Sequence, residues 1–495
     1  MISKCCSIDE PSTTLPFCSV LTFDYTLRMS GFSDRAVTLL KDFCHSRLHV
    51  QQIQAQLILH NLQSNPTIAH HFITVCQSHN LLNSALLLFT LFVPRPHVFI
   101  FNSLIRAFSH SHHHHNSLTP LSIFAHMHRN TILPNHYTFP FLFKSLSAPC
   151  HFAQAQSVHA HVLKLGHLHD IYVHNSLLGV YAASPRLLSL CRQLFDEMTH
   201  RDVVSWTVMI MGFRNAGKFD DALLAFEQMQ YAGVAPNRVT MVNALAACAD
   251  SGAVEMGAWI HDFIRRNGWE LDVVLGTALI DMYAKCGRVE EGVRVFSSVK
   301  EKNVFTWNAV IKGLALAKSG EEAIRLFNRM EQDGVRADEV TLLAVLSACN
   351  HSGLVDMGRQ IFGFLVEGKY GFIPNVKHYA CMVDLLARSG SLREAFEVMR
   401  CMPFDPTKAM WGSLLVSSKS QGDLEFSEFV ARKLVELEPA NSAYYVHLSN
   451  LYAEMGRWDD VEKVRGMMKD RQLTKDLGCS SVEVEEQGHT SQVLL

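Results

Sequence analysis

Patterns that would identify an enzyme, a metalloprotein or a membrane protein are missing from the sequence. The 13 cysteines are scattered, and no two have the Cys-x-x-Cys spacing of zinc and redox sites. No HExxH motif, phosphate-binding glycine loop or Ser/His/Asp arrangement occurs. The longest apolar run, residues 81–93, is interrupted by Asn83 and Ser84 and is too short to span a bilayer. We therefore expect no catalytic residue, no metal site, no cofactor and no membrane span.

The chain also lacks an excess of either charge. Its formal net charge is −3 over 495 residues, so no bulk basic field predicts non-specific binding to nucleic acid. A specific reader of nucleic acid remains compatible with this balance. The first thirty residues are rich in Ser, Thr and Cys but contain Asp9, Glu10 and Asp24, whereas organellar transit peptides are poor in acids. Residues 1–34 therefore carry only a weak targeting signal.

What the sequence does contain is a repeated pair of apolar helical stripes. In residues 203–237, a first stripe has the i, i+3, i+4, i+7 spacing of one helix face, and a second follows after Gly217. Gly233 and Pro236 end the second helix. The stripe residues are Trp206, Met209, Ile210 and Phe213 in the first helix and Ala222, Phe226 and Met229 in the second. A helical hairpin of this size needs neighbours to bury both stripes.

Similar units follow one another from residue 67 to residue 406, with boundaries at 97, 135, 170, 202, 237, 272, 303, 338 and 375. Units of 35 residues alternate with units of 35 to 37 and then of 31 or 32. This superperiod of three predicts an all-α fold, a right-handed α-solenoid superhelix of antiparallel helical hairpins. The four histidines 112–115 suggest a metal site, but no cysteine or carboxylate accompanies them, so an exposed insertion in a turn is favoured.

Several long phrases carry a resemblance to a known family. They are LIDMYAKCG at 279–287, LSACNHSGLVDMG at 346–358 and HYACMVDLLARSG at 378–390. The chain resembles a plant pentatricopeptide-repeat protein of the PLS subclass, which has normal, long and short repeats. MWGSLL at 410–415 and LSNLYAEMGRW at 448–458 resemble the E-type extension of that subclass. The expected organisation is an N-terminal segment (1–34), a repeat array (35–406), a TPR-like E-type extension (407–474) and a short tail (475–495).

Many relatives continue into a cytidine-deaminase-like domain, called DYW, that needs a zinc ligand set and a catalytic glutamate. Neither His-x-Glu nor Cys-x-x-Cys is present, and Ser481 stands where the family usually has tryptophan. We therefore expect the chain to lack the DYW domain and not to be an enzyme.

The resemblance also implies an RNA-reading surface. Repeats of this kind take one base per hairpin. In the family, the fifth and last residues of normal and short units face the base edge. The second residue helps to sandwich the base. Carried over, the readers are Asn102 with Asn135, Asn175 with Asp202, Thr207 with Asn237, Thr277 with Asn303, and Asn308 with Asp338. The sandwich candidates are Phe99, Tyr172, Val204, Val274 and Phe305.

By the family's pairing rules, Asn/Asp implies uracil, Thr/Asn adenine and Asn/Asn cytosine. The implied target is 5′-C-n-U-A-n-A-U-3′, with the long units contributing each unread n. Two positions fit poorly: His71 with His97 is a pair outside the rules, and Pro140 has no side chain that could bond a base. For every reader, packing against the next hairpin is the alternative interpretation.

The resemblance implies an organellar factor that binds single-stranded RNA and selects a site for C-to-U editing. The expected partner is a DYW-type deaminase or an editing accessory protein, recruited in trans through residues 407–474. Mitochondrion is the favoured location, with chloroplast as the alternative. RNA stabilisation, splicing or translation without editing, and a protein-binding TPR-like scaffold, are the competing functions.

Overall fold

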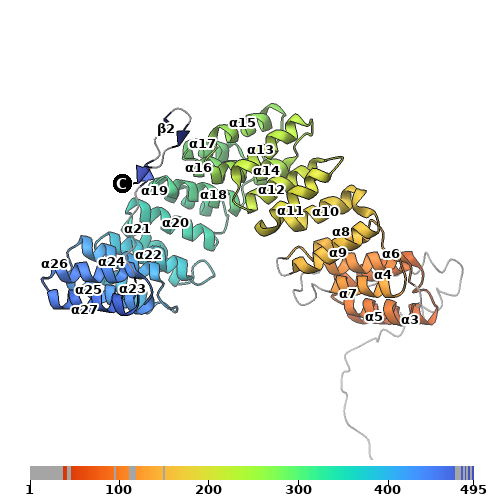
Figure 1. The fold of residues 1–495 in the computed structure, drawn as a ribbon, viewed down its shortest axis with the longest axis horizontal. Coiled ribbons are helices and arrows are strands. Elements are labelled where there is room, and N and C mark those ends of the chain that lie inside the picture. Colours follow the sequence, from red (N-terminus) through yellow and green to blue (C-terminus); the bar gives the residue numbers. More distant parts are fainter. Residues whose placement is uncertain are drawn as a thin grey trace, which may run out of the picture. The chain divides into compact units, whose positions relative to one another are not determined.

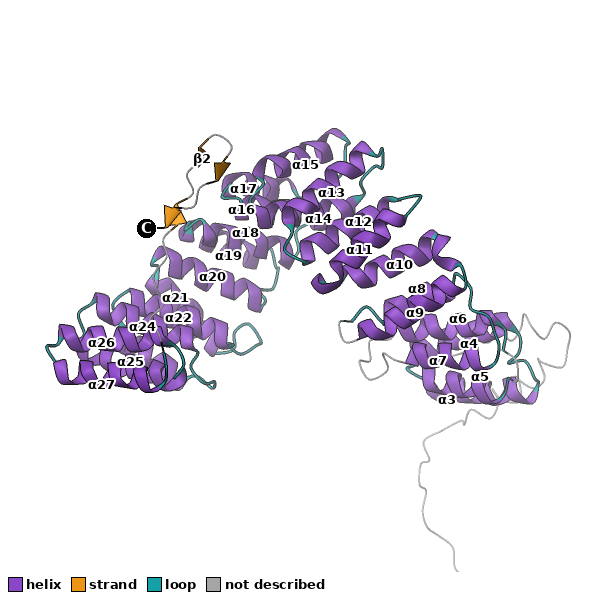
Figure 2. Cartoon of the chain, in the orientation of Figure 1, coloured by secondary structure: helices purple, strands orange, loops and turns teal. Residues whose placement is uncertain are grey.

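The computed structural model describes residues 37–38, 40–41, 46–93, 96–110, 119–148 and 151–473, together with four two-residue strands beyond them. Its elements alternate between the first and second helices of successive hairpins (Figures 1 and 2). The predicted N-terminal segment 1–34 and the histidines 112–115 lie outside the described residues.

The first helices of the hairpins carry even numbers. They are α4 (Pro66–Ser78), α6 (Val98–Ser109), α8 (Thr138–Ser145), α10 (Ile171–Ala182), α12 (Val203–Asn215), α14 (Arg238–Ser251), α16 (Val273–Lys285), α18 (Val304–Leu316), α20 (Glu339–Ser352), α22 (Val376–Arg388), α24 (Lys408–Ser420) and α26 (Ser442–Glu454).

The second helices carry odd numbers, and α3 precedes the first complete hairpin. They are α3 (Arg47–Leu59), α5 (Leu82–Leu91), α7 (Thr119–Arg129), α9 (Phe152–Lys164), α11 (Leu188–Glu197), α13 (Phe219–Tyr231), α15 (Val254–Arg266), α17 (Val289–Ser298), α19 (Gly320–Gln332), α21 (Val355–Val366), α23 (Leu392–Cys401), α25 (Leu424–Leu437) and α27 (Trp458–Asp470). Two short 3₁₀ turns, η3 (His167–His169) and η4 (Pro185–Leu187), adjoin α10 and α11.

The chain divides into two compact units, residues 1–243 and 244–495, with the division inside α14. In the first unit, α4, α6, α8, α10 and α12 pack each against the next. In the second, α16, α18, α20, α22 and α24 do the same. Each unit is thus a stack of antiparallel hairpins, which confirms the predicted all-α solenoid class.

The stripes predicted in residues 203–237 form the core of their hairpin. Trp206, Met209, Ile210 and Phe213 of α12 are buried, and so are Ala222, Phe226 and Met229 of α13. Gly217 joins the helices in the left-handed conformation, with φ of 72°, which favours glycine because a Cβ would be strained there. The apolar periodicity therefore predicted both the helices and the faces that they bury.

For most first helices, the N-cap is the last residue of the preceding unit. Asp202, Asp272, Asn303 and Asp338 are the N-caps of α12, α16, α18 and α20, and each side chain accepts hydrogen bonds from backbone N–H groups of the first turn. The last residue of a unit therefore has a structural role in addition to any contact with a ligand.

The structure shifts one predicted register by a residue. Asn65 is the N-cap of α4, and its side chain accepts from the N–H groups of Thr67 and Ile68, so the unit starts at Pro66 rather than at Thr67. The fifth residue of this hairpin is consequently His70, not His71. Asn followed by Pro is a common start of a helix, and this signal in the sequence was overlooked.

Four strands follow the last helix: β1 (Ser481–Val482) pairs antiparallel with β4 (Val493–Leu494), and β2 (Glu485–Glu486) pairs antiparallel with β3 (His489–Thr490). These strands were not predicted from the sequence. Every described helix falls short of the length and apolarity that a membrane crossing requires.

Candidate nucleic-acid interface

The five predicted reader pairs lie along the first helices and form one recurring arrangement. Four of the fifth residues are only 6–9% exposed, namely Asn102, Asn175, Thr207 and Asn308, and Thr277 is half-buried. Each last residue is more exposed than its partner, and Asp202, Asn303 and Asp338 are the N-caps of the helices that follow them. The last residue of each pair therefore lies nearer to the surface, and the fifth residue lies beneath it.

In the three pairs with a fifth-position asparagine, the two reader side chains bond directly. The Nδ2 atoms of Asn102, Asn175 and Asn308 donate to Oδ1 of their partners at 3.0, 3.1 and 3.0 Å. The structure thus brings together each pair that the sequence predicted, although the two members are 27 to 33 residues apart.

The two threonine pairs are joined through a third side chain. Thr207 Oγ1 lies 2.7 Å from Thr240 Oγ1, which lies 3.0 Å from Asn237 Oδ1. Thr277 Oγ1 lies 3.2 Å from Thr306 Oγ1, which lies 3.3 Å from Asn303 Oδ1. These bridging hydroxyls were not predicted from the sequence.

Helix capping fixes which polar atom of each last residue remains for a ligand. In Asn303, the oxygen accepts from the backbone N–H groups of Phe305 and Thr306, so the amide cannot be reversed and its NH₂ group stays available. Asn135 is fixed in the same way by the N–H of Tyr137. In Asp338, the hydrogen bonds from Asn308 and Thr341 converge on Oδ1, so Oδ2 can accept from a ligand. An asparagine therefore presents donors and an aspartate presents an acceptor.

The two aspartates of the reader pairs are held in the charged form. Burial alone would raise the pKa of Asp338, but the hydrogen bonds from Thr341 and Asn308 outweigh it and hold the pKa below its ordinary value. The pKa of Asp202 is lowered by the same balance, with burial opposed by hydrogen bonds from Ser205 and Asn175. At neutral pH, both carboxylates therefore accept hydrogen bonds and have no proton to donate.

The sandwich candidates are exposed apolar side chains next to these pairs. Phe99, Tyr172, Val204, Val274 and Phe305 are between 42% and 73% exposed, although they lie on the same helices as the buried stripes. The long units carry equivalents that the sequence analysis did not select: Tyr137, Val239 and Val340 are second residues and are also exposed. Position in the unit was a sufficient signal to find them. An exposed apolar residue thus recurs in every unit from 98 to 375.

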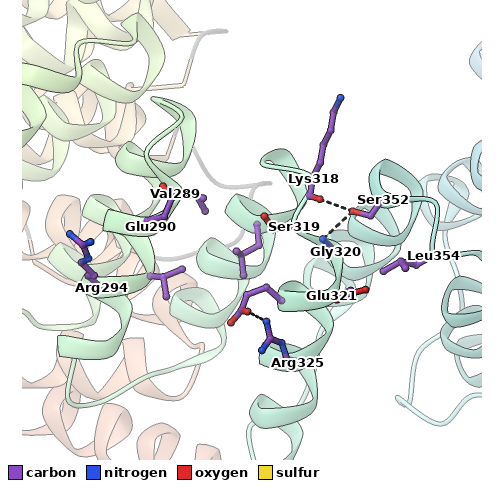
Figure 3. A pocket seen from close by; sticks show the side chains of 13 residues that line it. Val289, Glu290, Arg294, Lys318, Ser319, Gly320, Glu321, Arg325, Ser352 and Leu354 are labelled. Atoms are coloured by element: carbon purple, nitrogen blue, oxygen red, sulfur yellow. Dashed lines mark hydrogen bonds and ion pairs between the residues drawn. The ribbon is translucent and has the colours of Figure 1, made fainter.

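Other features of the surface have structural explanations. A cavity of about 740 Å³ in the second unit is lined by residues of α17, α18 and α19 and holds none of the reader or sandwich residues (Figure 3). In its lining, Ser352 accepts from the N–H of Gly320 at 3.0 Å and donates to the carbonyl of Lys318 at 3.0 Å. Among the residues that the structure describes, no group of three His, Cys, Asp or Glu could hold a metal ion.

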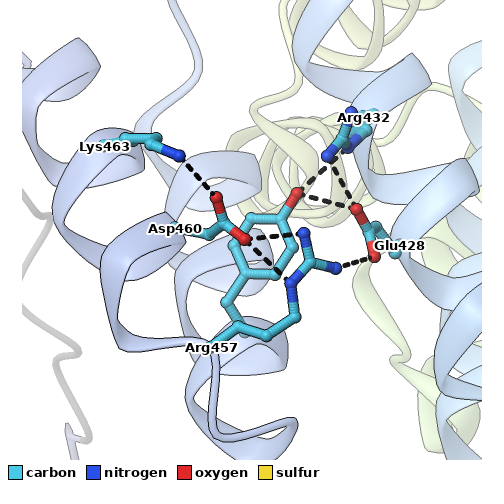
Figure 4. A network of polar contacts seen from close by, with 6 residues as sticks. Glu428, Arg432, Arg457, Asp460 and Lys463 are labelled. Carbon is cyan, nitrogen blue, oxygen red and sulfur yellow. Dashed lines mark hydrogen bonds and ion pairs between the residues drawn. The ribbon is translucent and has the colours of Figure 1, made fainter.

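The extension ends in a polar network that connects its helices (Figure 4). Glu428 of α25 accepts from Arg432 at 2.7 Å and from Arg457 at 2.6 Å, and the hydroxyl of Tyr452 donates to it at 3.0 Å. Arg457 also covers the ring of Tyr452 at 4.6 Å and pairs with Asp460 of α27 at 2.6 Å. Because each member has several partners, the network fixes how α26 and α27 sit on α25.

Fold and surface together define a class: an α-solenoid of hairpins, five of which present one polar pair beside one exposed apolar residue. Comparison with known proteins gives the family. The PPR repeat family matches residues 201–250 and 302–351, the PPR repeat matches 277–304 and 378–404, and the E motif matches 421–483. One pentatricopeptide repeat-containing protein of Arabidopsis thaliana is 35% identical, with 93% of this chain and 92% of the relative covered. Another is 37% identical over 89% and 96%.

The chain therefore belongs to the pentatricopeptide repeat family, and its E motif confirms the predicted E-type subclass. Among solved structures, the pentatricopeptide repeat protein PPR10 in complex with an 18-nucleotide psaJ RNA element is similar, with a TM-score of 0.71. It is 16% identical, and the match covers 92% of this chain and 71% of that one. A crystal structure of PPR10 from maize gives a TM-score of 0.65 at 16% identity, over 92% of this chain and 68% of that one. These likenesses support the solenoid fold.

Proposed function

We propose that this protein binds single-stranded RNA in a sequence-specific manner, with one base for each hairpin. The observation that carries the proposal is the recurrence, in five hairpins, of a polar pair beside an exposed apolar side chain, with the pair bonded directly in three hairpins and through a hydroxyl of the next hairpin in two. A base has an apolar face and a polar edge. The apolar side chain of such a site can stack on the face, and the polar pair can hydrogen-bond to the edge. The RNA-bound relative PPR10 supports the same conclusion.

The chemistry of the last residue agrees with the expected pairing rules. Uracil presents an N3–H donor between two carbonyls, and the free carboxylate oxygens of Asp202 and Asp338 are acceptors. Cytosine presents acceptors at N3 and O2, and the amide of Asn135 presents donors. For Asn237 and Asn303, the same donors suit N1 of adenine, while the threonine hydroxyl of the pair suits the amino group. The target proposed for residues 98–338 remains 5′-C-n-U-A-n-A-U-3′.

We further propose that the RNA is an organellar transcript and that the protein selects a cytidine for C-to-U editing. The E motif at residues 421–483 supports this, together with curated relatives whose names describe them as chloroplastic. The extension would recruit the deaminase in trans, and the network around Glu428 would keep its surface rigid. Mitochondrion is retained as the proposed location, with chloroplast as the alternative.

Binding by the full chain to a panel of RNAs tests the first proposal. The panel contains the proposed target and variants with one base exchanged at a time. We expect each exchange at C, U or A to weaken binding roughly tenfold, because a mismatched base leaves a buried polar group unpaired. Exchanges at either n should have little effect. Equal binding to every RNA would contradict sequence-specific reading.

Transcript sequencing tests the editing proposal separately. In plants that lack the protein, we expect one or a few organellar cytidines to remain unconverted, each downstream of a matching sequence. Unchanged conversion with altered transcript ends or splicing would contradict editing and favour a role in RNA stability or splicing. Unchanged transcripts of every kind would favour the scaffold alternative.

A further inference from the structure

A third polar residue accompanies every reader pair. The third residue of the hairpin that follows is a hydroxyl in all five cases: Thr138, Ser205, Thr240, Thr306 and Thr341. In the long units the fifth residues are Pro140, Val242 and Leu343, and the third residues of the hairpins that follow them are Val173, Leu275 and His378. The hydroxyl therefore occurs after a reader pair and is absent after a long unit.

Helix capping does not require this hydroxyl. Asp170 caps α10 with Val173 at the third position, and Asp272 caps α16 with Leu275 there. Asn375 forms a complete capping box with His378 instead of a hydroxyl. Because α10, α16 and α22 are capped without Ser or Thr at this position, its coincidence with reader pairs needs another explanation.

The contacts of Thr341 supply that explanation. Its hydroxyl is buried and lies 2.6 Å from Asn308 Oδ1 and 2.9 Å from Asp338 Oδ1. A hydroxyl that donates to Asn308 Oδ1 fixes the orientation of the amide, so that Nδ2 faces Asp338. Thr138 holds Asn102 in the same way at 2.7 Å. In the threonine pairs, Thr240 and Thr306 bridge the two readers.

One hairpin lacks this support. Ser205 bonds Asp202 but has no recorded bond with Asn175, and Asn175 Oδ1 is a buried acceptor without a hydrogen-bond partner. No hydrogen bond to Oδ1 therefore helps to hold the amide of Asn175 in one orientation. Two hairpins with the same Asn/Asp pair, 171–202 and 304–338, thus differ in the residue that positions their asparagine.

We propose that the third-residue hydroxyl of each following hairpin is a positioning residue that sets how strongly the preceding reader pair discriminates between bases. It acts through the fifth residue and does not itself touch the RNA. The inference rests on the proposed RNA reading. Its consequence is that the specificity of a hairpin is encoded by three residues, one of them on the next hairpin, and that Asn175/Asp202 discriminates uracil less sharply than Asn308/Asp338.

The test compares Thr341→Val with the wild-type full chain on RNAs that carry uracil or cytosine at the base assigned to Asn308/Asp338. Valine keeps the shape and removes the hydroxyl. We expect the uracil preference at this base to fall roughly tenfold, because a buried amide loses its fixed partner. The preference at the Asn175/Asp202 base should be unchanged, which provides an internal control. The uracil preference of Thr341→Ser at the Asn308/Asp338 base should lie between those of the wild type and Thr341→Val, because serine keeps the capping box.

The reciprocal variant is Ser205→Thr, which is expected to sharpen the uracil preference at the Asn175/Asp202 base several-fold. A purely structural role would change the melting temperature of Thr341→Val and weaken all RNAs equally, and that result would overturn the inference. An unchanged preference in both variants would do the same. If the wild-type chain shows no preference at either base, the proposed RNA reading itself fails, so the two failures are distinguishable.

Discussion

The hairpins α18–α19 and α20–α21 are neighbours that share most features of the surface but not all of them. Both expose an apolar second residue, Phe305 and Val340, and both are followed by a polar N-cap, Asp338 and Asn375. They differ at the fifth residue, which is Asn308 in one and Leu343 in the other. A polar last residue is thus explained by capping alone, and it is the fifth residue that distinguishes a reading hairpin from a long one.

Under the proposed function, the comparison also separates two kinds of contact with RNA. Stacking would require only the exposed second residue, which reading and long hairpins have in common. Base discrimination would require a polar fifth residue and its hydrogen-bond partners, which long hairpins lack. The long units are accordingly expected to hold a base without selecting it, which agrees with the unread n of the proposed target.

Removal of the stacking side chains has the largest expected effect. Phe305→Ala and Val340→Ala should each weaken binding to all RNAs, by about 1–3 kcal/mol for a lost base–aromatic contact and less for valine. The preference at every base should stay the same. Binding constants for the RNA panel measure this, with melting curves as the control for folding. If Val340→Ala has no effect, long hairpins do not hold a base.

Conversion of a long hairpin into a reading one is expected to give a smaller and more specific effect. Leu343→Asn supplies a fifth asparagine opposite Asn375, and His378→Thr supplies the hydroxyl that would position it. The double variant should gain roughly tenfold preference for cytosine at the base that follows the final U of the proposed target, since one well-formed hydrogen-bonded contact is worth about that much. Leu343→Asn alone should gain little. A full gain from the single variant would show that the hydroxyl is dispensable.

Loss of the N-cap separates the two roles of the last residue. Asp272→Ala and Asp202→Ala should each lower the free energy of unfolding by about 1 kcal/mol, because both side chains cap a helix. Of the two variants, only Asp202→Ala should also lose the preference for uracil at its base. Urea unfolding and RNA binding of both variants give the two readouts. A change of base preference in Asp272→Ala would contradict the assignment of 238–272 as an unread unit.

The smallest expected effect is that of pH. The folded-state pKa of Asp338 lies below its ordinary value, so the stability that its ionised form contributes is present above the unfolded pKa and is lost as the pH falls through the folded pKa. Discrimination of uracil at this base should therefore be constant from neutral pH down to the ordinary carboxyl range and decrease only below it. Asp338→Asn has no carboxyl group at this base and forms an Asn/Asn pair, so it should prefer cytosine both at neutral pH and in the acidic range. A loss of uracil preference between pH 6 and pH 7 would mean that another group controls this base.

The sequence was informative about the fold for a physical reason. Apolar spacing determines which helix faces can be buried, and in residues 203–237 the predicted stripe from Trp206 to Phe213 and its partners in α13 are all in the core. The register of residues 66–97 was off by one because the histidines there obscure the stripe, although Asn65 and Pro66 mark the start of the helix.

The candidate site was only partly predictable. The reader pairs came from family resemblance, and the structure brings the members of each pair together, while their contact with RNA remains a prediction. The bridging hydroxyls were missed because each lies on the following hairpin: Thr341 is 33 residues from Asn308. A search confined to one unit cannot find a contact between two. The pattern of Ser and Thr at third positions was present in the sequence, but its meaning depends on which side chains are buried together.

Exchange of one reader pair for another tests the central claim most directly. The double variant Thr207→Asn with Asn237→Asp gives hairpin 203–237 the pair that 304–338 has, and Thr240 is already in place as the hydroxyl of the next hairpin. Binding of the full chain is measured with RNAs that carry adenine or uracil at this one base. The expected result is a reversal of preference from adenine to uracil with the other bases unaffected. Equal weakening on both RNAs would contradict the reading of one base by each polar pair.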